Sequence, residues 1–186
     1  MRSLIENFHG IRQPVGMNLK RILLSFLAVT VLAGCEKTET SAPSSPDNSL
    51  PTRAQPKLPA MKIYLGAEML DAELALTPRE QQTGMMFRTN ITDESAMLFV
   101  FPQPFQASFW MKNCPHSLSA AYISPDGVIQ EIHHLEKYDT NSVVAANDNI
   151  QYVLEVKDGW FTRHNISTGT VIRTEKGSLA ETFFHK

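Results

Sequence analysis

The 186-residue chain has few cysteines, little net charge and no long apolar segment. Its two cysteines and six histidines show no repeated spacing of the kind that metal ligands have. A formal net charge of −2 gives no indication of nucleic-acid binding. The most apolar segment, Ile22 to Leu32, is too short to cross a bilayer core, which needs about 20 residues. The sequence therefore does not indicate a metal-binding repeat, a nucleic-acid binder or a transmembrane helix.

The N-terminal region has the pattern of a secretory signal instead. Lys20 and Arg21 precede the apolar run, and the run ends in "LAGC", Leu32 to Cys35. This ending resembles the lipobox of bacterial lipoproteins. The resemblance implies that residues 1–34 are removed as a signal peptide and that Cys35 is lipidated. Because the signal is complete without residues 1–16, Met17 is an alternative translation start; otherwise the basic region is unusually long.

A lipidated Cys35 would leave Cys114 alone, so no intramolecular disulfide is expected. Lipoproteins carry two or three acyl chains, which hold a protein stably at a membrane where a single chain does not. The next residue is Glu36 rather than aspartate, and by analogy with enterobacterial sorting this favours the outer membrane. We therefore expect a periplasm-facing envelope protein that is anchored to the membrane by the lipid on Cys35.

The remaining chain divides into a tether, a folded domain and a tail. Residues 35–60 hold the lipidated cysteine and a disordered tether that contains five of the eleven prolines. Residues 61–180 are long enough for one hydrophobic core, and residues 181–186 form an uninformative tail.

Many short strands and two short helices are expected in the domain. The segment "TPREQQTG" (77–84) has a capping box with proline at the first helical position, and "DGWFTRHN" (158–165) begins with an N-capping aspartate. "SPDG" (124–127) predicts a hairpin turn. Strands are expected in apolar or alternating segments, namely 61–65, 72–76, 96–101, 107–111, 150–156 and 170–174. The predicted class is α+β, mainly antiparallel β, as a compact sheet or partial barrel.

Four segments of the domain resemble the bacterial family called domain of unknown function 192. They are "ALTPREQQTGMMFR" (75–88), "AMLFVFPQPFQASFWMKN" (96–113), "YISPDGVIQEIH" (122–133) and "YVLEVKDGWFTRHNISTGTVI" (152–172). The resemblance implies a small, mainly β domain that is often exported or lipid-anchored, with no established activity. The chain departs from the family pattern at Cys114, where threonine is usual, and at Ser119, where an acid is frequent.

The segment "FWMKNCPHS" (109–117) holds the candidate binding residues Trp110, Lys112 and Asn113. If it continues as a strand, Trp110, Lys112 and Cys114 share one face. Trp110 would stack on a ligand and its two neighbours would hydrogen-bond it, which suits sugars or anionic groups. Alternatively, Trp110 covers a sheet face, Lys112 extends to solvent and Asn113 caps a turn.

Other candidates have structural alternatives as well. Arg88 is either half of a salt bridge or an anion ligand. Cys114 is a buried apolar residue or a nucleophile activated by Lys112 or His116. His116 with His133 or His134 would need a carboxylate such as Glu131 or Asp139 to bind zinc. We expect the Met85–Met86 pair to be core rather than a copper site.

The sequence favours a non-enzymatic, lipid-anchored binding or accessory module, with no catalytic residues, metal or cofactor. Its partner would be a small polar or glycan-like ligand, or another envelope protein, and not nucleic acid. The alternative is an envelope hydrolase or redox enzyme that uses Cys114 or a His/acid site.

Overall fold

The structure is a computed structural model and describes residues 49–184. The predicted signal peptide, Cys35 and most of the tether lie outside these residues. Within residues 49–184, no helix is long and apolar enough to cross a membrane.

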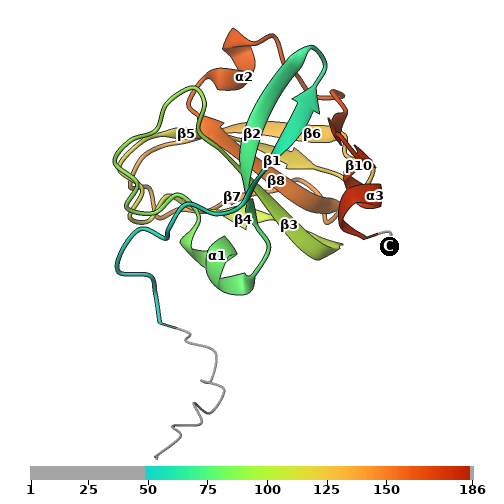
Figure 1. Cartoon of the computed structure of the whole chain (residues 1–186). Helices are drawn as coiled ribbons and strands as arrows, with labels where there is room; N and C mark the ends of the chain where they lie inside the picture. The colour runs from blue at the N-terminus through green and yellow to red at the C-terminus, as the bar shows by residue number, and fades with distance from the viewer. Residues whose placement is uncertain (1–48, 185–186) are drawn as a thin grey trace, which may run out of the picture. The chain divides into compact units, whose positions relative to one another are not determined.

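One eight-stranded sheet forms the main part of the fold (Figure 1). Its order is β10-β9-β1-β2-β3-β8-β5-β6, and neighbouring strands are antiparallel except β2 and β3, which are parallel. The strands are β1 (Ala60–Leu65), β2 (Glu68–Ala75), β3 (Ala96–Phe105), β5 (Leu118–Ile123), β6 (Ile129–Leu135), β8 (Ile150–Lys157), β9 (Ile172–Thr174) and β10 (Gly177–Ser178). A second, two-stranded sheet pairs β4 (Ser108–Phe109) with β7 (Val143–Val144).

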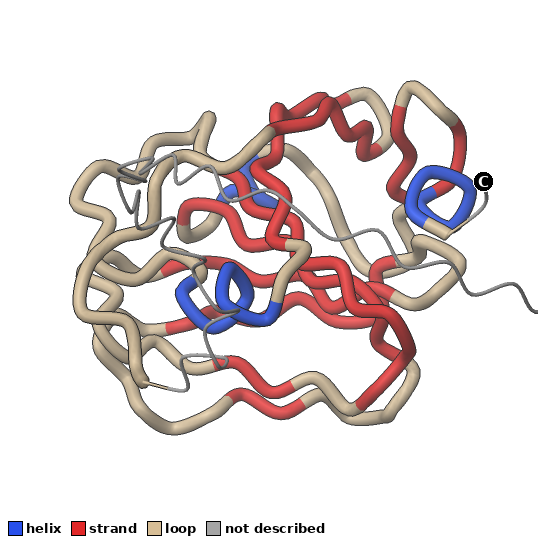
Figure 2. Tube along the Cα trace, turned by 60° about the horizontal axis from the view of Figure 1, so that its bottom comes forward, coloured by secondary structure: helices blue, strands red, loops and turns tan. Residues whose placement is uncertain are grey.

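The large sheet curls into a half-barrel, as the strands in Figure 2 show. The start of β6 returns to the start of β9 through an isolated bridge between Val128 and Val171. Beside it, the Ile129 amide donates to the Thr170 carbonyl at 2.9 Å, and the Ile172 amide donates to the Gly127 carbonyl at 2.8 Å. These bonds join distant strands at one end of the sheet, which confirms the predicted partial barrel.

The central strands are buried on both faces. In β8, Tyr152 and Leu154 belong to one hydrophobic cluster, whereas Ile150 and Val153 belong to another. The second face is covered by loop residues and by the β4–β7 pair, which belong to the same cluster as Ile150 and Val153. The acid of β8, Glu155, is therefore in the interior, with only 4 % of its surface exposed.

Three short helices are present in residues 49–184, one more than predicted. Helix α1 (Pro78–Thr83) has the expected capping box, with reciprocal bonds between Thr77 and Glu80. Helix α2 (Trp160–Arg163) is capped by Gly159 at φ 73° rather than by the aspartate before it. The additional helix, α3 (Leu179–Phe183), has its own capping box and buries Leu179. It crosses the predicted boundary between the domain, which was expected to end at residue 180, and the tail.

Residues 50–58, which the sequence assigns to the tether, contact the domain. The side chain of Gln55 donates to the carbonyls of Glu80 at 3.2 Å and Gly84 at 2.9 Å. Pro51 is buried, and the Leu58 amide donates to the Glu73 carboxylate at 2.7 Å. Ordered contacts with the domain thus begin before β1.

The close approach at Gly127 gives a test of the sheet closure. Gly127 has φ +78°, and a Cβ there would lie 3.0 Å from the Ile172 carbonyl oxygen. We predict that Gly127→Ala lowers the free energy of unfolding by roughly 2 kcal/mol in urea titrations, from backbone strain plus this contact. Gly169→Ala is the control, since its φ is +87° but a Cβ meets nothing within 4 Å. Equal losses in the two variants would contradict the close packing.

Candidate functional site

The segment after β4 is a tight turn rather than a strand. The strand ends at Phe109, and Asn113 has a left-handed backbone with φ 60°. The Asn113 carbonyl accepts from the Phe87 amide at 2.7 Å, while the Cys114 amide donates to the Met111 carbonyl at 3.0 Å. The strand predicted over 107–111 is therefore present only at Ser108–Phe109, and the alternation that placed Trp110, Lys112 and Cys114 on one face was wrong.

A neighbouring loop holds this turn in place. The Met111 amide donates to the Asp139 carbonyl at 2.7 Å, and the Tyr138 amide donates to the Cys114 carbonyl at 3.1 Å. Met111 and Cys114 are buried beneath the turn, whereas Tyr138 is 60 % exposed. The backbone at residues 111–114 is thus fixed from two sides.

Trp110 and Lys112 lie together on the surface of this turn. Trp110 is 37 % exposed, and the Lys112 Nζ lies 5.3 Å from the centre of the indole ring. This is a cation–π geometry. No carboxylate in residues 49–184 pairs with Lys112. Asn113 is half-buried in the same turn, so three of the four predicted ligand-binding residues are brought together.

The fourth predicted residue, Arg88, forms a two-pronged ion pair with Glu73 of β2. The Nη1–Oε1 and Nη2–Oε2 distances are 2.6 and 2.8 Å, and the side chains are 16 % and 10 % exposed. Burial acts to raise the pKa of the Glu73 carboxyl, but hydrogen bonds from Arg88 and from the Leu58 amide hold it below its usual value. Arg88 is therefore occupied as a salt bridge, the structural alternative considered for it.

A small cavity lies under Trp110. Its volume is about 40 Å³, and its lining comes from α1, the residues after α1, strands β3 and β8, and the turn: Gln81, Gln82, Thr83, Gly84, Met85, Met86, Phe99, Phe109, Trp110, Cys114 and Glu155. A cavity of this size holds a few water molecules or an ion but no organic ligand. It connects the exposed tryptophan with the acid buried in β8.

Glu155 is the carboxylic acid of this cavity. Burial raises the pKa of the Glu155 carboxyl to about 8, and the positive charge of Arg88 opposes that rise only in part. Its Oε2 has no hydrogen-bond partner among residues 49–184. Sequence reasoning missed this residue. The one available signal was an acid inside the apolar run "YVLEV".

The Cys114 thiol is not activated as a nucleophile. Burial raises its pKa to about 12, and the adjacent Glu155 charge adds to the rise. A reactive cysteine needs the opposite shift, toward the thiolate.

The three candidate histidines lie apart, each with its own partner. His116 contacts the Thr89 carbonyl at 3.0 Å, and His133 contacts Glu131 at 2.8 Å. His134 bonds to Asp158 at 2.8 Å and to Glu136 at 3.2 Å. Over residues 49–184, no group of three His, Cys, Asp or Glu side chains is arranged to hold a metal ion.

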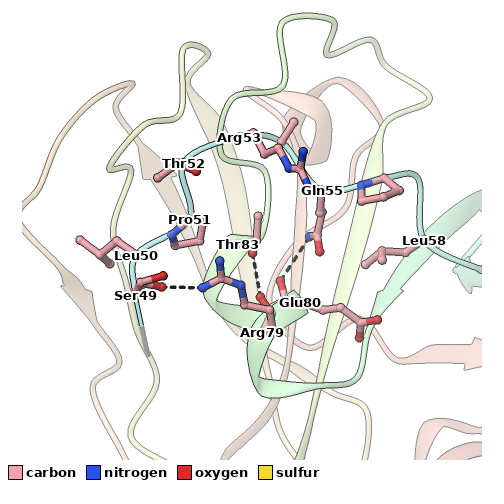
Figure 3. A pocket seen from close by; sticks show the side chains of 12 residues that line it. Ser49, Leu50, Pro51, Thr52, Arg53, Gln55, Leu58, Arg79, Glu80 and Thr83 are labelled. Atoms are coloured by element: carbon pink, nitrogen blue, oxygen red, sulfur yellow. Dashed lines mark hydrogen bonds between the residues drawn. The ribbon is translucent and has the colours of Figure 1, made fainter. Parts of the chain in front are cut away.

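A larger, open pocket of about 640 Å³ lies between residues 49–58 and α1 (Figure 3). Arg79 reaches across it to the Ser49 carbonyl, and Gln55 crosses it to the helix. Its one acid, Glu80, is already bonded to the amides of Leu76 and Thr77. The pocket is a seam between the N-terminal segment and the domain, and Arg79 and Gln55 bridge it.

Comparisons with known proteins agree with this fold. Residues 62–174, more than half of the chain, match the model of domain of unknown function 192, described as an uncharacterised ACR. The chain belongs to this family. No curated protein matches the sequence.

Two solved structures are similar to the chain. A protein of unknown function from Novosphingobium aromaticivorans is 29 % identical, with a TM-score of 0.59, and the match covers 73 % of this chain and 94 % of that one. A Sinorhizobium meliloti protein, provisionally described as a transcription regulator, is 26 % identical, with a TM-score of 0.57 and coverage of 62 % and 92 %.

The raised pKa of Glu155 predicts a pH-dependent stability. The folded state holds this proton up to about pH 8, whereas an unfolded glutamate releases it near pH 4.5. The contribution of Glu155 to stability is therefore complete below pH 4.5 and is lost as the pH rises to about 8. In urea titrations from pH 5 to 8, Glu155→Gln should become progressively more stable relative to wild type.

The exposed Glu94 supplies the control, because its side chain lies at the surface and Glu94→Gln should track wild type at every pH. A constant difference between Glu155→Gln and wild type across this range would show that the carboxyl is not buried as described.

Proposed function

We propose that this protein is a non-enzymatic binding module of the bacterial envelope, held at the membrane by a lipid on Cys35. The ligand is a small polar molecule of glycan type, and it binds on the surface of Trp110, Lys112 and Asn113. The observation that carries the proposal is the half-exposed indole of Trp110 on a turn fixed by backbone hydrogen bonds.

The chemistry of this surface suits a sugar. An indole face offers apolar contact to the C–H groups of a pyranose, and flanking ammonium and amide groups donate hydrogen bonds to its hydroxyls. Lys112 lies over the ring and is free of a carboxylate partner within residues 49–184, so it can turn toward a ligand. Tyr138 adds a second exposed aromatic residue on the adjoining loop.

The alternative, an envelope hydrolase or redox enzyme, has less support. The Cys114 thiol is buried and its pKa is raised, so it is protonated at neutral pH. Of the candidate histidines, His134 bonds to Asp158, and the Ser119 hydroxyl donates to the same carboxylate oxygen at 3.2 Å. The aspartate thus lies between the hydroxyl and the imidazole, whereas a nucleophile needs its base in direct contact.

A role in transcription regulation, by which the Sinorhizobium structure is described, has little support in this sequence. The net charge of −2 provides no excess of basic residues for phosphate contacts. A lipobox at Leu32 to Cys35 favours the envelope instead.

Trp110→Ala should weaken glycan binding by about tenfold or more, because loss of an aromatic anchor at a binding surface usually costs more than 1 kcal/mol. Isothermal titration of the full chain with N-acetylglucosamine oligosaccharides and with soluble peptidoglycan fragments measures the effect. Trp110→Phe should retain most of the affinity, and Cys114→Ser should leave it unchanged.

The reverse result, with loss of function in Cys114→Ser and none in Trp110→Ala, would support the enzyme. If wild-type protein binds neither ligand class, the glycan proposal fails.

Mass spectrometry of the protein purified from bacterial membranes tests the anchor. The expected N-terminal residue is a diacylglyceryl-modified Cys35, and Cys35→Ser should release the protein from the membrane fraction. An unmodified chain that begins before residue 35 would contradict this part of the proposal.

A further inference from the structure

Three sulfur-containing side chains meet at the cavity under Trp110. The consecutive residues Met85 and Met86 line it together with Cys114, which comes from a distant turn of the chain. Each is nearly inaccessible to solvent, with 3 %, 4 % and 5 % of its surface exposed. The cavity lining therefore includes two methionines and one cysteine.

The backbone brings the methionine segment and the cysteine turn side by side. Gly84 ends α1 at φ 47°, and the two methionines follow it directly. The next residue, Phe87, donates its amide to the Asn113 carbonyl at 2.7 Å, one residue before Cys114. This bond joins the methionine segment to the cysteine turn.

Glu155 supplies a second, independent indication of a ligand. Its side chain lines the same cavity from β8, and its Oε2 has no partner within residues 49–184. A buried polar atom without a partner is costly, so such an atom usually marks the place of a bound group. Packing of the methionines alone accounts neither for the cavity nor for this oxygen.

We infer that the cavity under Trp110 is a binding site for a soft monovalent metal ion, Cu(I), with Met85, Met86 and Cys114 as its sulfur ligands. Thioether and thiolate ligands select Cu(I), whereas zinc sites are built from imidazole, thiolate and carboxylate groups. The volume of about 40 Å³ suits an ion. The Met85–Met86 pair is buried, as the sequence indicated, but it also faces this cavity.

The remaining lining supports a cation. Trp110 covers the cavity, and the face of an indole ring attracts positive charge. The Glu155 oxygen can take the ion directly or through one water molecule. On binding, the Cys114 thiol releases its proton to solvent as the sulfur–copper bond forms, and copper remains in the Cu(I) state throughout.

The sulfur ligands of this site are buried, whereas the proposed glycan surface is exposed, and Trp110 contributes to both. Cys114→Thr removes one sulfur ligand and replaces it with a residue of similar size.

Competition for Cu(I) against a chromophoric Cu(I) chelator, under anaerobic conditions, tests the inference with the full chain. Wild-type protein should withdraw one equivalent of Cu(I). Cys114→Thr and Met86→Leu should each weaken binding by roughly tenfold or more. Met97→Leu is the matched control, because Met97 is fully buried in the same hydrophobic cluster but does not line the cavity.

Circular dichroism identifies any variant that fails to fold, and Ag(I) titration of wild-type protein supplies a second readout. Since Ag(I) resembles Cu(I) and would bind beneath the indole ring, it should change Trp110 fluorescence, and the change should be absent in Trp110→Phe. The inference is overturned if wild-type protein takes no Cu(I), if Cys114→Thr binds as wild type does, or if Zn(II) binds more tightly. Glycan binding by Cys114→Thr should be unaffected, which separates this result from the fate of the proposed function.

Discussion

Burial of the central strands on both faces is the constraint on which the rest of the structure depends. Strands β3, β8 and β5 each contribute side chains to two hydrophobic clusters, one on either side of the sheet. The second cluster is closed by α1, the turn at 110–114 and the β4–β7 pair rather than by another sheet. Any polar group on that face of β8 is therefore withdrawn from water, and this burial raises the pKa of the Glu155 carboxyl.

Glu73 has a comparable organising role at the edge of the same layer. Its carboxylate accepts two bonds from Arg88 and one from the Leu58 amide, so it joins the segment after α1 to the segment before β1. A buried carboxylate is stable only when it is paired and hydrogen-bonded in this way. One side chain of β2 thus links the N-terminal segment at Leu58 to the segment after α1 at Arg88.

Much of the fold could be predicted from the sequence, because its signals are local. The capping box of α1 and the turn at 124–127 depend on short-range geometry, and both are present. The family assignment, which rests on four segments in order, is confirmed. The capping box of α3 has an equally local signal in "SLAE" (178–181), which also predicts a helix start.

The candidate site was less predictable, since it depends on contacts between distant segments. The alternation of a strand could not be continued past Phe109, because the backbone enters a turn that is set by bonds to Phe87, Tyr138 and Asp139. Likewise, nothing near Glu155 in the sequence shows that loops cover its side of β8. The sequence leaves Arg88 as either a salt-bridge partner or an anion ligand, because its partner Glu73 is distant in the sequence.

The left-handed residues at the candidate site have a consequence for recognition. Phe87 and Asn113 both have φ 60°, and they are joined directly by a backbone hydrogen bond. Each conformation is unfavourable for a residue with a side chain, so the fold itself must maintain it. A ligand that meets this surface encounters a backbone already in its final shape. Association would then restrict few additional motions of the protein, and selectivity would rest on shape matching rather than on adjustment.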